Sequence, residues 1–372
     1  MNNIHKTGIV LVLSILGNFA GVHWALAQNY YVTALNPLAG YSRSVARGIN
    51  GSGQVIGSSL GNGGAAVIWT NGVPTNLGTL GGTETYGTAI NDKGQATGIS
   101  RTHSLSINAF FYNNGIMSSI GTLGGTDSFG YGINNSGAMT GEAYATSGAF
   151  AYLDNSGASM TSLGSLNSGF SIGLGINNSS DVTGYSRTVN GGPVHAFLTA
   201  GGQMNDLGVL PGYISSVGQG INDSSEVTGF VDTTDDSSGI IHPFLFSNGL
   251  MNDLGVLPGF VSGEGEGIND SGEIVGYLLS SSSEAAMMYK NGTMVDLNSQ
   301  ISSNSGWLLE QAYAVNSQGQ IVGDGNYNGV ETAFLLTPEA VPEASTIVSL
   351  GFLFVLGAGV LISAKRRTEI GG

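Results

Sequence analysis

The side chains of this chain that are best suited to chemistry are a small set of charged and polar residues. They lie in segments that otherwise contain small or apolar residues. Paired carboxylates such as Glu264 and Glu266 can act as acid and base in glycoside cleavage. A buried network of ion pairs without a ligand is the alternative interpretation. The residues of this candidate polar cluster are Arg43, Arg47, Glu264, Glu266, Glu310 and Gln311.

Three histidines, His103, His195 and His242, lie between the two ends of the chain. We find no Asp or Glu at a spacing that would complete a metal set with His195 or His242. A nucleophile also needs a base that a third group orients, and no local signature of this kind is present. The sequence therefore predicts no catalytic residue and no histidine metal site.

An acidic run contains Asp232, Asp235 and Asp236. Hard oxygen ligands suit Ca²⁺, so this loop is a candidate calcium site. Its spacing matches no recognised calcium loop, and a solvated acidic hairpin is the alternative. The chain has no Cys, which excludes disulfides and thiolate metal sites. No other cofactor is expected.

These residues lie within a repeated unit, whose centre has the form Gly-Ile-Asn-x-x-Gly-x-Val-x-Gly. Four segments surround each Asn in the same order. Asn-x-x-Gly is typical of a hairpin loop with a left-handed Gly, and Asn-Gly pairs such as Asn71-Gly72 predict a second tight turn. The third segments contain a small residue before a large apolar one, for example Ala109-Phe110 and Ala149-Phe150. The repeated Asn residues are Asn50, Asn91, Asn134, Asn177, Asn222, Asn269 and Asn316.

A four-stranded meander repeated every 41 to 47 residues is typical of a β-propeller blade. The sequence therefore predicts an all-β, seven-bladed propeller over residues 28–340. The seventh unit lacks a fourth segment, and the strand-like residues 31–35 can supply it. We expect this N-terminal strand to close the ring and to remove its open seam.

The segment before each Asn has small residues at its second and fourth positions, counted back from the Asn. Residues two apart share one face of a strand, so one face is expected to be bare and to accept the neighbouring blade. The opposite face carries larger residues such as Tyr131, Leu174 and Tyr313. The candidate polar cluster interrupts this pattern in units six, seven and one. Because these units adjoin in a closed ring, we expect the cluster in or beside the central channel.

Four aromatic residues occupy one equivalent place, nine residues before their Asn. They can stack on sugar rings or pack the blade edge, and the second role is the simpler one. These residues are Tyr41, Tyr213, Phe260 and Trp307.

The repeats resemble the HAF-type extracellular repeats, which are named for a His-Ala-Phe core. His195-Ala196-Phe197 matches that core in full, and His242-Pro243-Phe244 matches it in part. The resemblance covers residues 30–337. It implies an extracellular repeat protein and assigns no activity.

The two ends of the chain carry transport signals. Lys6, an apolar run and the small-x-small site before Ala27 predict a signal peptide over residues 1–27 with cleavage before Gln28, or else an uncleaved anchor. Residues 344–364 are uncharged, can span a bilayer as a helix and precede a basic Lys-Arg-Arg, which keeps the C-terminus inside.

The segment before this span, with Pro342, Glu343 and Ala344, resembles the PEP-CTERM sorting tail of Gram-negative bacteria over residues 341–372. Ala344 stands where the name-giving pattern has Pro. The resemblance implies cleavage by the membrane protease exosortase and release to the cell surface. A plain membrane anchor is the alternative.

The chain has a net charge of −15, which argues against nucleic acid and anionic lipid as partners. Signal peptidase and exosortase are the expected processing partners, and the membrane is contacted only through the tail. The function we expect is non-catalytic binding of polysaccharide or of a surface protein outside the cell. A secreted propeller hydrolase or lyase that acts on glycans is the alternative.

Overall fold

The structure is a computed structural model, and it describes residues 29–167, 169–235 and 239–339. The predicted signal peptide at 1–27, its cleavage site and the predicted tail at 341–372, with the helix at 344–364, lie outside these residues. Within the described residues, no helix combines the length and apolar character that a membrane crossing needs.

The described chain forms 28 strands and one short 3₁₀ helix, arranged in seven four-stranded antiparallel sheets. Blades one and two are β2 (Arg43–Ile49), β3 (Val55–Gly61), β4 (Gly63–Thr70), β5 (Val73–Asn76) and β6 (Gly81–Ile90), β7 (Ala96–Thr102), β8 (Ile107–Asn113), β9 (Ile116–Ser119). Blades three and four are β10 (Ser128–Ile133), β11 (Ala138–Ala145), β12 (Gly148–Asn155), β13 (Met160–Ser162) and β14 (Ser171–Ile176), β15 (Val182–Arg187), β16 (Val194–Ala200), β17 (Gln203–Gly208).

Blades five and six are β18 (Ser215–Ile221), β19 (Val227–Asp232), β20 (Ile241–Ser247), β21 (Leu250–Asp253) and β22 (Ser262–Ile268), β23 (Ile274–Leu279), β24 (Glu284–Lys290), β25 (Thr293–Asp296). The 3₁₀ helix η1 (Leu297–Gln300) follows β25. Blade seven is β26 (Trp307–Val315), β27 (Ile321–Tyr327), β28 (Val330–Pro338) and β1 (Tyr30–Leu35).

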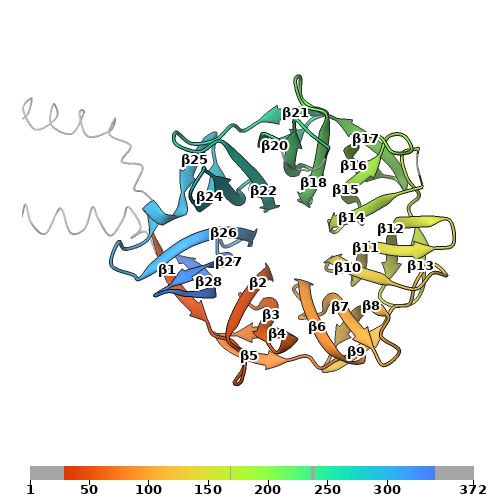
Figure 1. Cartoon of the computed structure of the whole chain (residues 1–372), viewed down its shortest axis with the longest axis horizontal. Coiled ribbons are helices and arrows are strands. Elements are labelled where there is room, and N and C mark those ends of the chain that lie inside the picture. Colours follow the sequence, from red (N-terminus) through yellow and green to blue (C-terminus); the bar gives the residue numbers. More distant parts are fainter. Residues whose placement is uncertain (1–28, 168, 236–238, 340–372) are drawn as a thin grey trace, which may run out of the picture. The chain divides into compact units, whose positions relative to one another are not determined.

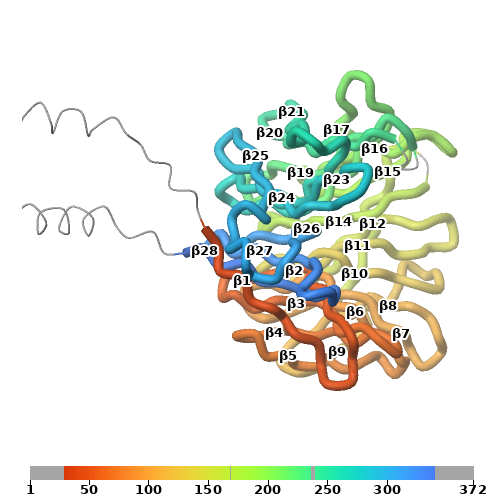
Figure 2. The backbone as a smooth tube through the Cα atoms, turned by 60° about the vertical axis from the view of Figure 1, so that its left-hand side comes forward, coloured from red at the N-terminus to blue at the C-terminus, as the bar shows by residue number. Residues whose placement is uncertain are grey.

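The seven sheets form a ring with their first strands innermost (Figures 1 and 2). In the seventh sheet β1 pairs with β28, from Tyr30 opposite Pro338 to Leu35 opposite Ala333. The first described strand therefore completes the last blade, as the sequence predicted. This pairing joins the first and last described strands in one sheet, so β28 is not left as an open edge of the ring.

The predicted turns are present in the structure. In the Asn-x-x-Gly loops the carbonyl of Asn50 accepts from the amide of Gly53, whose φ of +78° lies in the left-handed region. Asn71 and Gly72 both have positive φ, at 52° and 78°, which is the two-residue hairpin turn that matches strand twist.

The hydrophobic core is divided among the junctions between adjacent blades. One cluster joins Ile56 and Ala66 of blade one to Ile90 and Phe110 of blade two. Burying such a side chain contributes about 1.5–3 kcal/mol, so each blade is stabilised mainly by its neighbours. The fully buried third-strand residues at this position include Phe110, Tyr152, Phe197, Phe244, Met287 and Phe334.

The third repeat differs from the sequence prediction by two residues. Its buried pair is Ala151-Tyr152, because Gly141 pairs with Tyr152, just as Gly184 pairs with Phe197 in blade four. The predicted pair, Ala149-Phe150, lies nearer the hairpin end of β12. A slip of two residues keeps the same face of a strand, so the apolar pattern alone did not reveal it.

Each first strand contains a β-bulge that the sequence analysis missed. In β10, Gly130 pairs with Gly141 and Gly132 pairs with Thr140, so Tyr131 has no partner of its own. The same register shift occurs in β2, β6, β14, β18, β22 and β26.

The bulge corrects the prediction of one bare face. A Cβ on Gly132 would lie 3.2 Å from the Leu174 carbonyl oxygen of the next blade, whereas a Cβ on Gly130 would lie 2.3 Å from Thr97 Oγ1 of the preceding blade. The two small positions therefore face opposite neighbours, because the extra residue interrupts the alternation of the strand. Close blade contact is nevertheless the reason for both.

Candidate functional site

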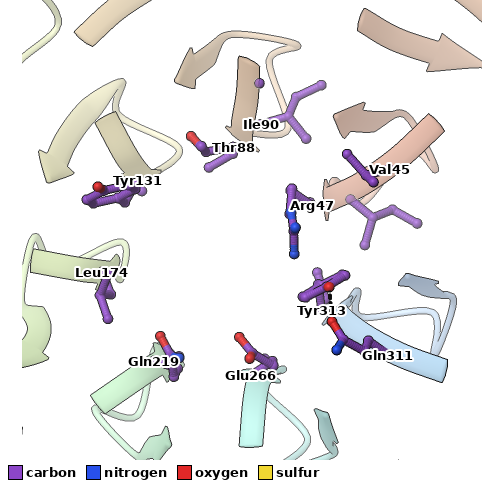
Figure 3. Close-up of a pocket in the computed structure, with 18 of the residues that line it drawn as sticks. Val45, Arg47, Thr88, Ile90, Tyr131, Leu174, Gln219, Glu266, Gln311 and Tyr313 are labelled. Atoms are coloured by element: carbon purple, nitrogen blue, oxygen red, sulfur yellow. Dashed lines mark hydrogen bonds between the residues drawn. The ribbon is translucent and has the colours of Figure 1, made fainter. Parts of the chain in front are cut away.

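The central channel opens into a cavity of about 980 Å³, here called the wide cavity (Figure 3). The bulged residue of every first strand points into it, because a bulge re-aims its side chain out of the regular ladder. We call these seven residues the bulge ring. They are Arg47, Thr88, Tyr131, Leu174, Gln219, Glu266 and Tyr313.

The wide cavity has a charged side and a neutral side. Blades six, seven and one contribute nearly all of its ionisable groups, and blades two to five contribute Tyr, Thr, Leu and Gln to the bulge ring. Figure 3 shows Tyr131 and Leu174 across the channel from Gln311 and Tyr313. Five of the six predicted cluster residues line the cavity, namely Arg43, Arg47, Glu266, Glu310 and Gln311.

Both arginines of the cavity have aromatic or acidic neighbours. The guanidinium carbon of Arg47 lies 3.9 Å from the ring centre of Tyr313, a cation–π contact. Arg43 Nη1 donates to both carboxylate oxygens of Glu331, at 2.5 and 2.6 Å, and so ties blade one to blade seven.

A chain of polar contacts continues from Tyr313 toward the rim. The hydroxyl of Tyr313 donates to Gln311 Oε1, and Gln311 Nε2 donates to Glu284 Oε2 at 2.9 Å. The two sides of the Gln311 amide are therefore fixed, which orients Tyr313 against Arg47.

Glu266 is the one carboxylic acid of the bulge ring, and its pKa is strongly shifted. Burial, followed by the nearby charge of Glu264, raises the pKa of Glu266 to about 8, and the guanidinium of Arg47 opposes this rise. Glu266 therefore keeps its proton at neutral pH, when most carboxyl groups are ionised.

Glu264 lies elsewhere, although the sequence placed both acids together. It is absent from the cavity lining and accepts hydrogen bonds from Tyr277 and Gln219, while burial raises its pKa. Glu266 is the bulged residue, so the two acids do not share a face as in a regular strand. They do not converge on one ligand position.

Three further acids of the cavity were missed by the sequence analysis. Glu284 begins β24, Asp324 lies in β27 and Glu331 lies in β28. The search for departures from the repeat covered first strands only, whereas these residues come from second and third strands. Glu284 and Glu331 follow the hairpin between the second and third strands of their blades. These hairpins lie at the same end of the channel as the start of each first strand, and this position was the signal that could have identified them.

The other end of the channel, here called the narrow mouth, is built from the seven repeated asparagines and encloses about 210 Å³. Each Asn side chain donates from Nδ2 to the backbone carbonyl of the Asn in the next blade. Asn134 to Asn177 is 3.0 Å, and Asn316 to Asn50 closes the cycle at 3.0 Å. The other five bonds start at Asn50, Asn91, Asn177, Asn222 and Asn269.

Each of these asparagines also fixes its own turn. Asn134 Oδ1 accepts from the amides of Ser136 and Ala138, at 3.0 and 2.9 Å. The side chain is thus satisfied on both sides although it is only 3% exposed. The sequence analysis explained Asn as a turn residue and missed its contact with the next blade.

The residue after each Asn forms an exposed outer rim at the narrow mouth. The amide of Asp92 donates to Asn135 Oδ1, the amide of Asn135 donates to Asn178 Oδ1, and the pattern continues to Asp270. A second side-chain bond strengthens two of these steps, since Asn135 Nδ2 donates to Asp92 Oδ2 and Asn178 Nδ2 donates to Asp223 Oδ2, both at 2.8 Å.

The histidines of the His-Ala-Phe segments do have acidic partners. His195 Nδ1 lies 2.9 Å from Asp206 Oδ1, and His242 Nδ1 lies 3.0 Å from Asp253 Oδ2. The sequence analysis considered only spacings that would complete a metal set and missed these partners, because antiparallel pairing of the third and fourth strands joins residues 11 apart.

These pairs fix a turn beside the fourth strand. Asp206 Oδ1 also accepts from the amide of Gly208, where the chain leaves β17. The pairs are not part of the cavity lining. No group of three or more His, Cys, Asp or Glu side chains that could hold a metal occurs in the described part of the chain.

The acids of the candidate calcium loop have partners within the protein. Asp232 accepts from the amide of Thr234 at 2.9 Å. Asp235 contacts Arg187 Nη1 at 3.3 Å and the amide of Val194 at 3.1 Å in the neighbouring blade. Asp236 lies outside the described residues.

The aromatic residues before the first strands pack against the blades. Tyr213 and Phe260 lie against hydrophobic clusters at their own blades, and Trp307 stacks on Tyr327 at 4.8 Å between ring centres. With Tyr41, they are absent from the cavity lining. Packing of the blade edge, the simpler interpretation, accounts for Tyr213, Phe260 and Trp307.

No protein-family model matches the chain, and no curated protein sequence is similar enough to count as a relative. Solved structures do resemble it. The β-propeller domain of the Trilobed protease from Pyrococcus furiosus, described as an open velcro propeller, has a TM-score of 0.54 at 8% identity and covers 82% of this chain and 97% of that one.

A puromycin-hydrolyzing peptidase from Mycobacterium tuberculosis has a TM-score of 0.51 at 11% identity, covering 84% of this chain and 54% of the peptidase. A gluconolactonase from Xanthomonas campestris has a TM-score of 0.44 at 9% identity, covering 86% and 94%. The first two likenesses define the class of the chain as a β-propeller. At such low identity they carry no activity over to it.

Proposed function

We propose that this chain is an exported, non-catalytic β-propeller that binds polysaccharide or protein at the cell surface, with the wide cavity as its binding site. The observation that carries the proposal is the contrast within the first strands. Six of the seven blades have Ile beside the repeated Asn, and all have Gly or Ala before it. The bulge ring, in contrast, contains six residue types in seven equivalent positions.

Equivalent backbone positions with equivalent packing needs favour the same residue in every blade. The bulge ring departs from this rule although each member has the same backbone geometry. Its side chains line an open cavity. Thr88 Oγ1 also donates to the Gly130 carbonyl of the next blade, and Leu174 also packs against the cluster around Val217, but these contacts do not account for six residue types in seven equivalent positions. A single asymmetric ligand in the channel would require different contacts from each blade.

The proposed location rests on the two ends of the sequence. Signal peptidase would cut after Ala27, and exosortase would cut near Pro342, which leaves the propeller outside the cell. Mass spectrometry of the protein recovered from the medium and from the inner membrane tests this. Termini at Gln28 and near Pro342 are expected, and an intact tail in the inner membrane would contradict release.

A secreted hydrolase or lyase acting on glycans is the second candidate. The observation in its favour is Glu266, which keeps its proton at neutral pH as a general acid must. Against it, Glu264 turns away and leaves Glu266 without its predicted partner. Under this alternative, incubation with a polysaccharide releases new reducing ends, and Glu266→Gln abolishes the release.

Binding itself is tested with the purified chain on an array of glycans and cell-surface proteins. We expect retention of one ligand class by the wild type and its loss in Arg47→Ala and Tyr131→Ala. Asp270→Asn, at the opposite end of the channel, serves as the matched control, because Asn already occupies this place in blades three and four and the oxygen that accepts from the Asp223 amide is kept. Equal binding by all four proteins would place the site outside the wide cavity.

A further inference from the structure

The charge of the wide cavity is unbalanced. Its lining contains five carboxyl groups and two guanidinium groups, and four carboxyl groups remain to be balanced because Glu266 keeps its proton. The bidentate contact with Glu331 occupies Arg43, while Arg47 lies over the ring of Tyr313 and its charge acts on the carboxyl of Asp324. The acids are Glu266, Glu284, Glu310, Asp324 and Glu331.

Among the acids of the wide cavity, Glu310 is the carboxyl group that most clearly needs a positively charged partner. No hydrogen bond or ion pair of its side chain occurs within the described residues, although the side chain is half-buried. Burial, followed by the charges of Glu284, Asp324 and Glu331, raises its pKa. Acids that repel one another in a cavity are stabilised by a cation that arrives with a ligand.

The opposite side of the cavity offers a different surface. Tyr86 and Tyr131 present aromatic rings there, beside Leu174 and the amide of Gln219. Aromatic faces bind the apolar faces of sugar rings, and an amide exchanges hydrogen bonds with hydroxyl groups. The cavity volume of about 980 Å³ lies at the upper end of the range for ligand pockets, so a short oligosaccharide fits.

We propose that the wide cavity binds a saccharide that carries a free amino group, with its ammonium between Glu284 and Glu310 and its sugar rings toward Tyr86 and Tyr131. This inference rests on the proposed binding function of the same cavity. A uronic acid polymer would bring further negative charge to a cavity with an excess of carboxylates, and an N-acetylated polymer would bring no charge to balance them.

The test is isothermal titration of the full-length chain with three hexasaccharides of equal length: β-1,4-linked glucosamine, its N-acetylated form and galacturonic acid. We expect the glucosamine hexamer to bind about tenfold more tightly than the acetylated one. Glu310→Gln and Glu284→Gln should each weaken its binding about fivefold and leave the acetylated hexamer unaffected.

Asp270→Asn is the control, because it removes one negative charge at the narrow mouth and keeps the oxygen that accepts from the Asp223 amide. It should bind like the wild type. Raised salt should weaken only the glucosamine complex, and this measurement needs no variant.

Two failures are distinguishable. If the acetylated or the uronic hexamer binds as tightly as the glucosamine hexamer, or if both Gln variants bind glucosamine like the wild type, the amino-sugar inference is wrong and the binding function stands. If none of the three hexamers binds, saccharide binding in the cavity is itself overturned.

Discussion

The same seven strands contribute to both ends of the channel, and yet the two ends differ in how far their residues repeat from blade to blade. At the narrow mouth, every blade contributes the same Asn, and the seven side chains form one closed cycle of hydrogen bonds. At the wide cavity, three residues earlier in each strand, the bulge ring varies from Arg to Leu. The difference separates asparagines whose main contacts close the ring from residues that line a cavity where a ligand can bind.

The largest expected effect concerns the glycine opposite each bulge. A Cβ on Gly184 would lie 1.9 Å from the Ile172 carbonyl oxygen, so Gly184→Ala must displace the bulge. We expect a loss of at least about 3 kcal/mol in unfolding free energy, measured by urea denaturation. Leu174→Ala, in the bulge ring of the same blade, should lose about 1 kcal/mol, because this side chain is only partly buried against the cluster around Val217. Equal losses would show that the bulge ring is also structural.

The next effect concerns the cycle at the narrow mouth. Asn134→Ala removes the buried donor to Asn177 and the acceptor for two amides, one buried and one partly buried, and should lower the unfolding free energy by about 2 kcal/mol. Asn135→Ala, one residue later on the exposed rim, should cost about 0.5 kcal/mol in the same urea experiment. A loss at Asn135 as large as at Asn134 would remove the distinction between the buried cycle and the rim.

A pH-dependent effect is expected at the wide cavity. Glu266 has a folded-state pKa of about 8, whereas the unfolded chain releases this proton near pH 4.5. The folded state therefore binds more protons between these values, and stability falls as the pH rises through this window.

Glu266→Gln should remove this loss, so that the variant is more stable than the wild type at pH 8 by at least about 1 kcal/mol, with a smaller difference at pH 4. Thermal denaturation at a series of pH values measures it. An unchanged slope with pH would mean that Glu266 is ionised in the folded protein.

The smallest effect is expected at the rim pair between blades one and seven. Arg43 and Glu331 are both more than 40% exposed, so Arg43→Gln should change the unfolding free energy by less than about 1 kcal/mol. Differential scanning calorimetry at low and high salt measures the change. A larger loss of unfolding free energy would mean that this ion pair between blades one and seven helps to close the ring.

The sequence was sufficient for the fold because the fold depends on repetition. The repeated pattern predicts the number of blades and turns such as Asn71-Gly72. The absence of a fourth segment from the seventh repeat predicts the closing strand at Tyr30–Leu35. The bulge could not be predicted in this way. Strand alternation assigns faces only in a regular ladder, and the extra residue at Tyr131 changes the faces of its neighbours.

The site was predictable only in part for the same reason. Arg47 and Glu266 were found because they interrupt the first-strand pattern, and both line the cavity. Glu284, Asp324 and Glu331 arrive from strands whose faces the sequence did not assign. The pairing of His195 with Asp206 depends on register between two strands, which a spacing of 11 residues does not reveal without that register.

The most direct test of the division between the two ends is the affinity of two alanine variants for the glucosamine hexamer. Tyr131→Ala changes the wide cavity and Asn178→Ala changes the rim of the narrow mouth. Titration calorimetry should find binding weakened at least about fivefold in Tyr131→Ala and unchanged in Asn178→Ala. Unchanged binding in Tyr131→Ala together with weakened binding in Asn178→Ala would contradict the assignment and place the ligand at the narrow mouth.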